Sequence, residues 1–120
     1  MWLGAMDRRI AVVVSVGFLT TMDHMEKNHC MCWKFDGLLE LVDYADIYSL
    51  IAPRPLQCQN GLQEPPTQFY VPIAREALEE IRTIYLDLDR PENVTLDVRK
   101  GGHEIDVPAL LYFLEKHLSE

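Results

Sequence analysis

The chain has 120 residues, of which 48% are hydrophobic and 25% are charged, a composition typical of one globular domain. Its net charge of −8 and pI near 4.9 argue against a surface for nucleic acid or an anionic membrane. The three cysteines do not make a disulfide framework, and no apolar run approaches the ~20 residues of a membrane span, so we expect a reducing, cytoplasmic protein.

The first half of the chain predicts one strand and one long helix. Met1–Met6 is expected to be the last turn of a helix. Ile10–Val16 is almost continuously apolar and β-branched, which is typical of a strand covered on both faces of a parallel sheet. Such a strand needs a partner on each edge, so the chain resembles part of a larger domain. Residues 18–37 are predicted to be irregular, and apolar residues recur at helical spacing from Leu38 to Ile51.

The second half predicts two strands that alternate with two helices. Leu56–Gln59 is a short strand, and Pro72 suits the first turn of the helix that follows. Residues 93–99 alternate apolar and polar as a half-buried strand does, and Asp106 opens the last helix. Strands alternating with helices indicate an α/β fold, with a parallel sheet and helices on its faces.

Two strand-end loops carry ionisable groups that could act together. Glu64 follows the strand at Leu56–Gln59, and His103 follows the strand at 93–99 after two glycines that permit a tight bend. The loops at the carboxyl ends of strands are where α/β sheets keep their chemistry. An imidazole is the usual general base near neutral pH, and a carboxylate beside it fixes its tautomer. Glu64 and His103 therefore fit the acid and histidine of a nucleophile–acid–histidine triad.

Several short motifs occur in a characteristic order. They are Trp2–Ile10, His29–Cys32, Gly37–Leu39, Ile51–Leu56, Asn60–Pro65, Gly101–His103, Val107-Pro108 and Phe113-Leu114. Together they resemble the C-terminal part of an α/β-hydrolase of the acetyl-xylan-esterase/dienelactone-hydrolase-like group. The resemblance extends from Met1 to Leu118, about the last third to half of a typical member.

This resemblance implies a partial α/β-hydrolase fold, with parallel strands and helices on both faces. His103 takes the position of the family's catalytic histidine, and Glu64 stands where the family usually has Asp. The segment 66–69 departs from the family's shorter pattern. The family's Gly-x-Ser-x-Gly and oxyanion-hole loop would lie upstream of residue 1. The resemblance thus implies that residues 1–120 are the C-terminal portion of a serine ester hydrolase and are inactive alone. The full-length protein would act on a small-molecule or sugar ester.

Other nucleophiles and acids are open at this point. Ser15 lies in half of a Gly-x-Ser-x-Gly motif, but Val13 occupies a position where the elbow needs a small residue. Cys58 could be a thiol nucleophile, although a thiol in mid-strand more often packs. Glu64 could be a solvated loop carboxylate, in which case Asp87 or Asp89 would be the next candidates for the acid.

Two further interpretations concern metals and partners. His24, His29, Cys30 and Cys32 could be metal ligands, but a Cys-x-Cys spacing fits zinc poorly, and we expect neither a metal nor a cofactor. Alternatively, the chain is a non-catalytic α/β module. The open edge of the strand at Ile10–Val16 would then pair with another copy, so we expect a homo-oligomer in either case.

Overall fold

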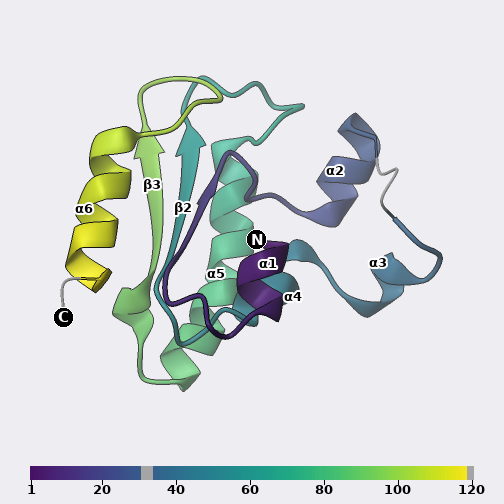
Figure 1. Cartoon of the computed structure of the whole chain (residues 1–120). Helices are drawn as coiled ribbons and strands as arrows, with labels where there is room; N and C mark the ends of the chain where they lie inside the picture. The colour runs from purple at the N-terminus through teal and green to yellow at the C-terminus, as the bar shows by residue number, and fades with distance from the viewer. Residues whose placement is uncertain (31–33, 119–120) are drawn as a thin grey trace.

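A three-stranded parallel sheet in the order β1-β2-β3 forms the centre of the fold (Figure 1). The computed structural model describes residues 1–30 and 34–118. Strands β1, β2 and β3 span Val13–Val16, Leu56–Gly61 and Val94–Arg99. The register sets Cys58 of the central strand beside Ser15 on one side and Leu96 on the other. The carboxyl ends of all three strands therefore lie at the same end of the sheet, which we call its carboxyl edge.

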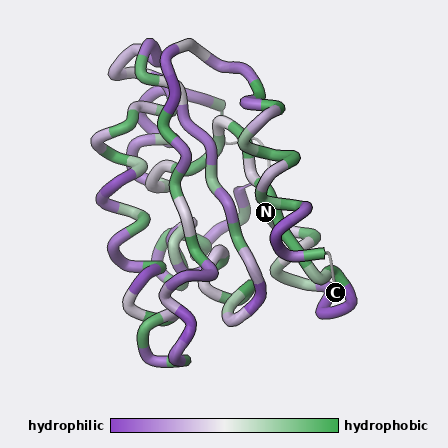
Figure 2. Tube along the Cα trace, turned by 90° about the vertical axis from the view of Figure 1, so that its left-hand side faces the viewer, coloured by the Kyte–Doolittle hydropathy of each residue, from purple (hydrophilic) through white to green (hydrophobic). Residues whose placement is uncertain are grey.

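Helices cover both faces of this sheet, as the alternation of elements predicts. They are α1 (Trp2–Met6), α2 (Met22–Asn28), α3 (Leu38–Leu41), α4 (Tyr44–Ser49), α5 (Val71–Asp87), the 3-10 helix η1 (Pro91–Asn93) and α6 (Val107–Leu118). The two views show α5 and α6 on opposite sides of the sheet (Figures 1 and 2). Among the described residues, no helix is both long and apolar enough to cross a membrane.

The main core lies between the sheet and the helices α4 and α5. Strand β2 is buried along its whole length, and its alternate side chains face opposite sides of the sheet. Leu56 and Cys58 belong to the hydrophobic core, whereas Gln57 and Gln59 pair with each other through a hydrogen bond. Helix α5 contributes an apolar stripe to the core at helical spacing, made of Ala74, Ala77, Leu78, Ile81 and Tyr85.

The first strand is shorter than predicted, because a remote segment limits its pairing. The prediction began at Ile10, but β1 begins at Val13, whose N–H donates to the carbonyl of Pro55 at 2.9 Å. Continuing the register upstream would set residues 10–12 against 53–55, where Pro53 and Pro55 have no N–H to donate. The ladder between β1 and β2 therefore ends there.

The segment predicted to be irregular contains helix α2, so that prediction was wrong. The side chain of Thr21 caps the helix by accepting from the N–H of His24 at 3.3 Å. Asp23 lies in the first turn and Lys27 in the last, where each suits the helix dipole. These capping and charge signals are present in the sequence.

The single helix predicted from Leu38 to Ile51 is two helices, α3 and α4. Asp43 interrupts it, because its side chain forms a capping box with Asp46 at the start of α4. The same carboxylate also accepts from the N–H of Met22 at 2.8 Å and so joins α2 to α4. The apolar spacing continues across this break, which is why periodicity alone missed it.

Candidate active site

Glu64 and His103 lie in contact beyond the carboxyl ends of β2 and β3. Nδ1 of His103 is 2.6 Å from Oε1 of Glu64. The Glu64 side chain is 4% exposed and the His103 side chain is 59% exposed. An ionised carboxylate only accepts hydrogen bonds, so this contact suits the tautomer with the proton on Nδ1, which leaves Nε2 able to accept one.

The loops that carry these two residues are joined through their backbones. The N–H of Leu62 donates to the carbonyl of Arg99, and the N–H of Gln63 donates to the carbonyl of Gly101, both at 2.9 Å. These bonds continue the β2–β3 pairing beyond the sheet. Gly61 permits the approach, because a Cβ on it would lie 2.3 Å from the carbonyl oxygen of Gly102. The acid and the base are thus held by adjacent strands.

The loop after Glu64 is anchored at several points. Nδ2 of Asn60, which is 2% exposed, donates to the carbonyls of Phe69 at 2.9 Å and Leu19 at 3.3 Å. Nε2 of His24 lies 2.8 Å from the carbonyl oxygen of Gln68, which connects the same loop to α2. The segment 66–69, where the sequence departs from the family pattern, is therefore part of the site's framework.

Phe69 extends the site as an aromatic neighbour of the imidazole. Its ring centroid is 5.2 Å from that of His103 and 5.6 Å from that of His29, which is stacked on it. The ring of Phe18 also packs against Phe69, with 5.5 Å between the two ring centroids. Sequence reasoning missed Asn60 and Phe69 as parts of this site, although it noted that the segment 66–69 departs from the family's shorter pattern.

The structure does not bring Ser15 to this pair. Ser15 is 6% exposed, and its Oγ lies 2.6 Å from the phenol oxygen of Tyr48 inside the core. The Oγ of Ser49 donates to the carbonyl of Ala45 within α4. Both serine hydroxyls of the described part of the chain are thus committed to structural hydrogen bonds.

The other candidate groups also lie apart from the pair or in unsuitable surroundings. Cys58 is fully buried, and its burial raises the pKa of the thiol to about 12, so it remains protonated. Asp87 and Asp89 are exposed at and just beyond the C-terminal end of α5, where the chain turns toward the amino end of β3 (Figure 1), whereas Glu64 follows the carboxyl end of β2.

The predicted alternative of a metal site finds no support in the described residues. Within residues 1–30 and 34–118, no cluster of three or more His, Cys, Asp or Glu side chains could hold a metal ion. His24 and His29 contact the loop around Phe69, and Cys30 is exposed. Cys32, the fourth residue of that alternative, lies outside the described residues.

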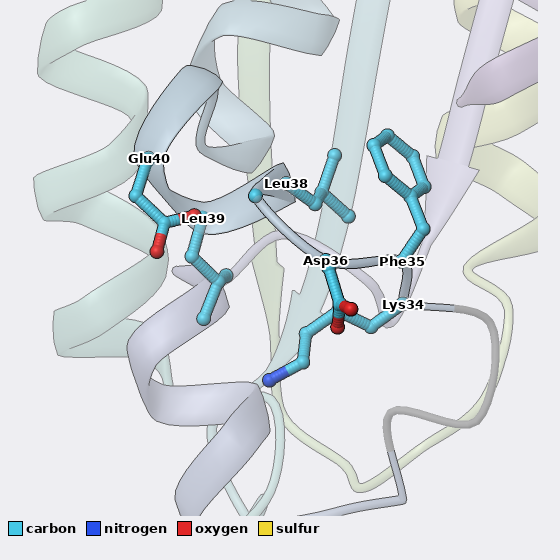
Figure 3. A pocket seen from close by; sticks show the side chains of 7 residues that line it. Lys34, Phe35, Asp36, Leu38, Leu39 and Glu40 are labelled. Carbon is cyan, nitrogen blue, oxygen red and sulfur yellow. The ribbon is translucent and has the colours of Figure 1, made fainter.

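A hollow on the surface lies in another part of the molecule. It measures about 260 Å³ and is lined by residues 34–40, at the start of α3 (Figure 3). Lys34 on its rim forms an ion pair with Glu26 of α2. Neither Glu64 nor His103 lines this hollow, so we do not assign it to the candidate site.

Comparisons with known proteins give solved structures only. No family model and no curated protein matches the chain. A carbohydrate esterase family 15 glucuronoyl esterase from Caldicellulosiruptor kristjansonii is similar, with a TM-score of 0.72 and 20% identity over 97% of this chain. A candidate acetyl xylan esterase from Bacteroides fragilis NCTC 9343 is similar too, with a TM-score of 0.72 and 17% identity over 98%.

The chain spans 39% of the length of each of these two structures. At such identities the similarity concerns the fold, and both neighbours are esterases by their descriptions. The parallel order of β1, β2 and β3, and the helices on both faces of the sheet, agree with it. The chain therefore has a partial α/β-hydrolase fold, with parallel strands and helices on both faces of the sheet.

Proposed function

We propose that residues 1–120 are the C-terminal portion of a serine ester hydrolase domain, in which Glu64 is the triad acid and His103 the base. The observation that carries this proposal is the 2.6 Å contact between a buried carboxylate and a mostly exposed imidazole at the carboxyl edge of the sheet. The acid precedes the histidine along the chain, as in α/β-hydrolases. The esterase neighbours support the same reaction class.

In the proposed reaction a serine from a segment outside these residues attacks the carbonyl carbon of an ester. Nε2 of His103 takes the serine proton and then gives it to the leaving alcohol as the acyl–serine ester forms. A water molecule next attacks that acyl group, again with His103 as base, and the serine and the free acid are released. Glu64 holds the ring and stabilises the imidazolium, and its burial shields that interaction from water.

The substrate class follows from the neighbours' descriptions as a proposal. One of them is described as a glucuronoyl esterase and the other as a candidate acetyl xylan esterase. We therefore propose an ester of a carbohydrate as the substrate of the whole protein. Neither a metal nor a cofactor is needed for a serine, a histidine and a carboxylate to perform this chemistry.

The first test uses the chain as it stands. The sequence contains no Gly-x-Ser-x-Gly motif, so hydrolysis of p-nitrophenyl acetate by the purified chain should match the buffer rate. Loss of the nucleophile from such a triad costs on the order of 10⁶ in turnover. A Ser15→Ala variant is the matched control. Robust turnover that disappears in this variant would contradict the proposal.

The second test looks for the complementary segment. The DNA upstream of the coding sequence should contain an in-frame Gly-x-Ser-x-Gly motif, and the longer protein should hydrolyse acetylated sugars. In that protein, Glu64→Gln should lower turnover by roughly 10⁴, because the imidazole loses its orienting carboxylate. The matched control is Glu92→Gln, which alters an exposed carboxylate far from the pair. Unchanged activity in Glu64→Gln would remove Glu64 from the triad.

The open edge of β1 favours a second candidate function, that of a non-catalytic module which self-associates. Within the described residues β1 pairs only with β2, and Trp2, Leu3 and Met6 of the adjacent α1 are 45–75% exposed. The N–H groups of Val13 and Gly17 point to β2, so by alternation that of Val14 points away from it.

Light scattering over a concentration series tests this self-association. We expect a dimer that Val14→Pro disrupts, because proline removes the outward donor while the inward ladder stays intact. A clean monomer at high concentration would contradict the self-association, and it would leave the hydrolase proposal unaffected.

A further inference from the structure

We propose that Gly17, the residue after β1, is a positioning residue for His103, and that the site excludes any side chain at this position. The inference rests on the proposed role of His103 as the base. Its test reads the placement of the imidazole directly, so it can fail or succeed independently of any hydrolysis measurement.

The imidazole of His103 lies directly against the Cα of Gly17. A Cβ added to Gly17 would be 2.5 Å from Cε1, 2.7 Å from Nδ1 and 3.2 Å from Nε2 of the ring. The two shorter distances are below any ordinary contact between carbon and a ring atom. Gly17 also has a φ of +58°, which L residues other than glycine rarely adopt. An alanine here would therefore meet the same ring atom that bonds to Glu64.

The backbone at Gly17 is not able to move away from the ring without breaking other bonds. Its N–H donates to the carbonyl of Gln59 at 2.7 Å. The side chain of Gln59, which is 1% exposed, pairs in both directions with the backbone of Asp106: it accepts from the N–H at 3.0 Å and donates to the carbonyl at 3.2 Å. Gln59 thus ties the end of β1 and the end of the histidine loop to one point of β2.

The imidazole of His103, by contrast, can move in one direction, toward solvent. Its side chain is 59% exposed, and its described neighbours are Glu64, the ring of Phe69 and the backbone of Gly17. A methyl group at position 17 should push the ring toward solvent and away from Glu64. The expected result is an intact fold in which the Glu64–His103 hydrogen bond is lost.

This role also explains a sequence feature that the proposed function leaves aside. Ser15-Val16-Gly17 resembles the second half of a Gly-x-Ser-x-Gly motif, but Ser15 is buried against Tyr48. The imidazole of His103 explains the glycine at position 17, because the ring leaves no room there for a Cβ. The place of this glycine is set by the register that brings the end of β1 beside β2, and not by an elbow around Ser15.

The first experiment compares Gly17→Ala with Gly37→Ala by proton NMR. Gly37 has a φ of +84°, but a Cβ there meets nothing closer than a Glu40 carboxylate oxygen at 3.9 Å, so the control carries the backbone cost without the clash. The hydrogen-bonded Nδ1 proton of His103 should give a low-field resonance, assigned by its loss in Glu64→Gln. We expect it to disappear in Gly17→Ala and to persist in Gly37→Ala. Its persistence in Gly17→Ala overturns the proposal.

A double-mutant cycle of Gly17→Ala with His103→Ala is a second test of the proposal. It can be read even if Gly17→Ala fails to fold or if exchange with solvent hides the Nδ1 proton. In the wild-type background Gly17→Ala should lower Tm more than Gly37→Ala. In a His103→Ala background the ring is absent, so Gly17→Ala should lower Tm by much less than it does in the wild type, whereas the effect of Gly37→Ala should not change. If Gly17→Ala is as damaging without the imidazole as with it, or unfolds the chain in both backgrounds, the proposal is wrong.

Discussion

The Oγ of Ser15 and the phenol oxygen of Tyr48 lie 2.6 Å apart in the core, joining β1 to α4. Ser15 is 6% exposed and Tyr48 is fully buried. Burial keeps the pKa of the Tyr48 phenol well above its usual value, so the phenol stays neutral and can donate or accept this bond. The serine that most resembles a nucleophile in the sequence is therefore a structural residue.

Removing either partner of this pair should destabilise the chain by a similar amount. Ser15→Ala leaves the buried phenol of Tyr48 without its partner, and Tyr48→Phe does the same to the hydroxyl of Ser15. A buried polar group without a partner lowers the free energy of unfolding by about 1–3 kcal/mol. The double variant should cost less than the sum of the two, because the second substitution removes the orphaned group. Urea denaturation measures all three variants. Additive losses would show that the bond contributes nothing of its own.

The thiol of Cys58 should be unreactive in the folded chain. It is fully buried, and its pKa is raised to about 12, so the thiolate that alkylating reagents require is scarce at pH 8. Cys30 is exposed and serves as the control within the same sample. Peptide mapping after brief treatment with iodoacetamide should find Cys30 alkylated and Cys58 unmodified until urea is added. Equal labelling of the two in the folded chain would return Cys58 to the possible nucleophiles.

The sequence predicts most of the fold where the signals are local. Pro72 correctly indicates the start of α5, and the alternation through residues 93–99 indicates β3. The start of β1 is not a local property, because it depends on prolines about 40 residues later that do not donate to the ladder. The break between α3 and α4 depends on the cap at Asp43, which periodicity does not detect.

The candidate site divides in the same way. That Glu64 and His103 meet could be expected from topology, because adjacent parallel strands end at the same edge and their loops follow directly. The contacts of Gly17 and Phe69 with the imidazole depend on how β1 and a long loop pack around that edge. No spacing in the sequence encodes those contacts. The catalytic roles of Glu64 and His103 stay predictions until activity is measured.

Arg54 should be a major contributor to stability. Its guanidinium donates to the carbonyls of Gly4, Asp7, Ile10, Leu50 and Ile51 at 2.7–3.3 Å. These bonds attach α1 and the segment between α1 and β1 to the end of α4. Arg54→Lys keeps the charge but loses the planar set of donors, so we expect the free energy of unfolding to fall by about 2–4 kcal/mol.

The control for that variant is Arg82→Lys. Arg82 forms a surface ion pair with Glu79 one turn away on α5, and its substitution should change the free energy of unfolding by less than about 0.5 kcal/mol. Urea denaturation compares the two variants. Equal, small effects would show that water can replace the five hydrogen bonds of Arg54 without lowering the free energy of unfolding.

Asp97 should make stability depend on pH in the direction opposite to a paired carboxylate. It lies on β3 beside Gln59, and its Oδ2 is buried without a hydrogen-bond donor among the described residues. Burial, and secondarily the charge of Asp106, raise its pKa above the usual value, and Arg99 opposes them only in part. The folded chain therefore binds this proton more tightly than the unfolded chain, for which a pKa of about 3.9 is usual.

At pH 7 the ionised Asp97 lowers the free energy of unfolding, and this penalty should disappear as the pH falls through the raised pKa toward about 3.9. Asp97→Asn has no charge to bury, so it should be more stable than the wild type at pH 7, by a margin that shrinks on acidification. Urea midpoints from pH 7 to pH 4 measure this margin, with the exposed Asp36→Asn as control. A variant less stable than the wild type at pH 7 would mean that the attraction of Arg99 for Asp97 outweighs the cost of burial.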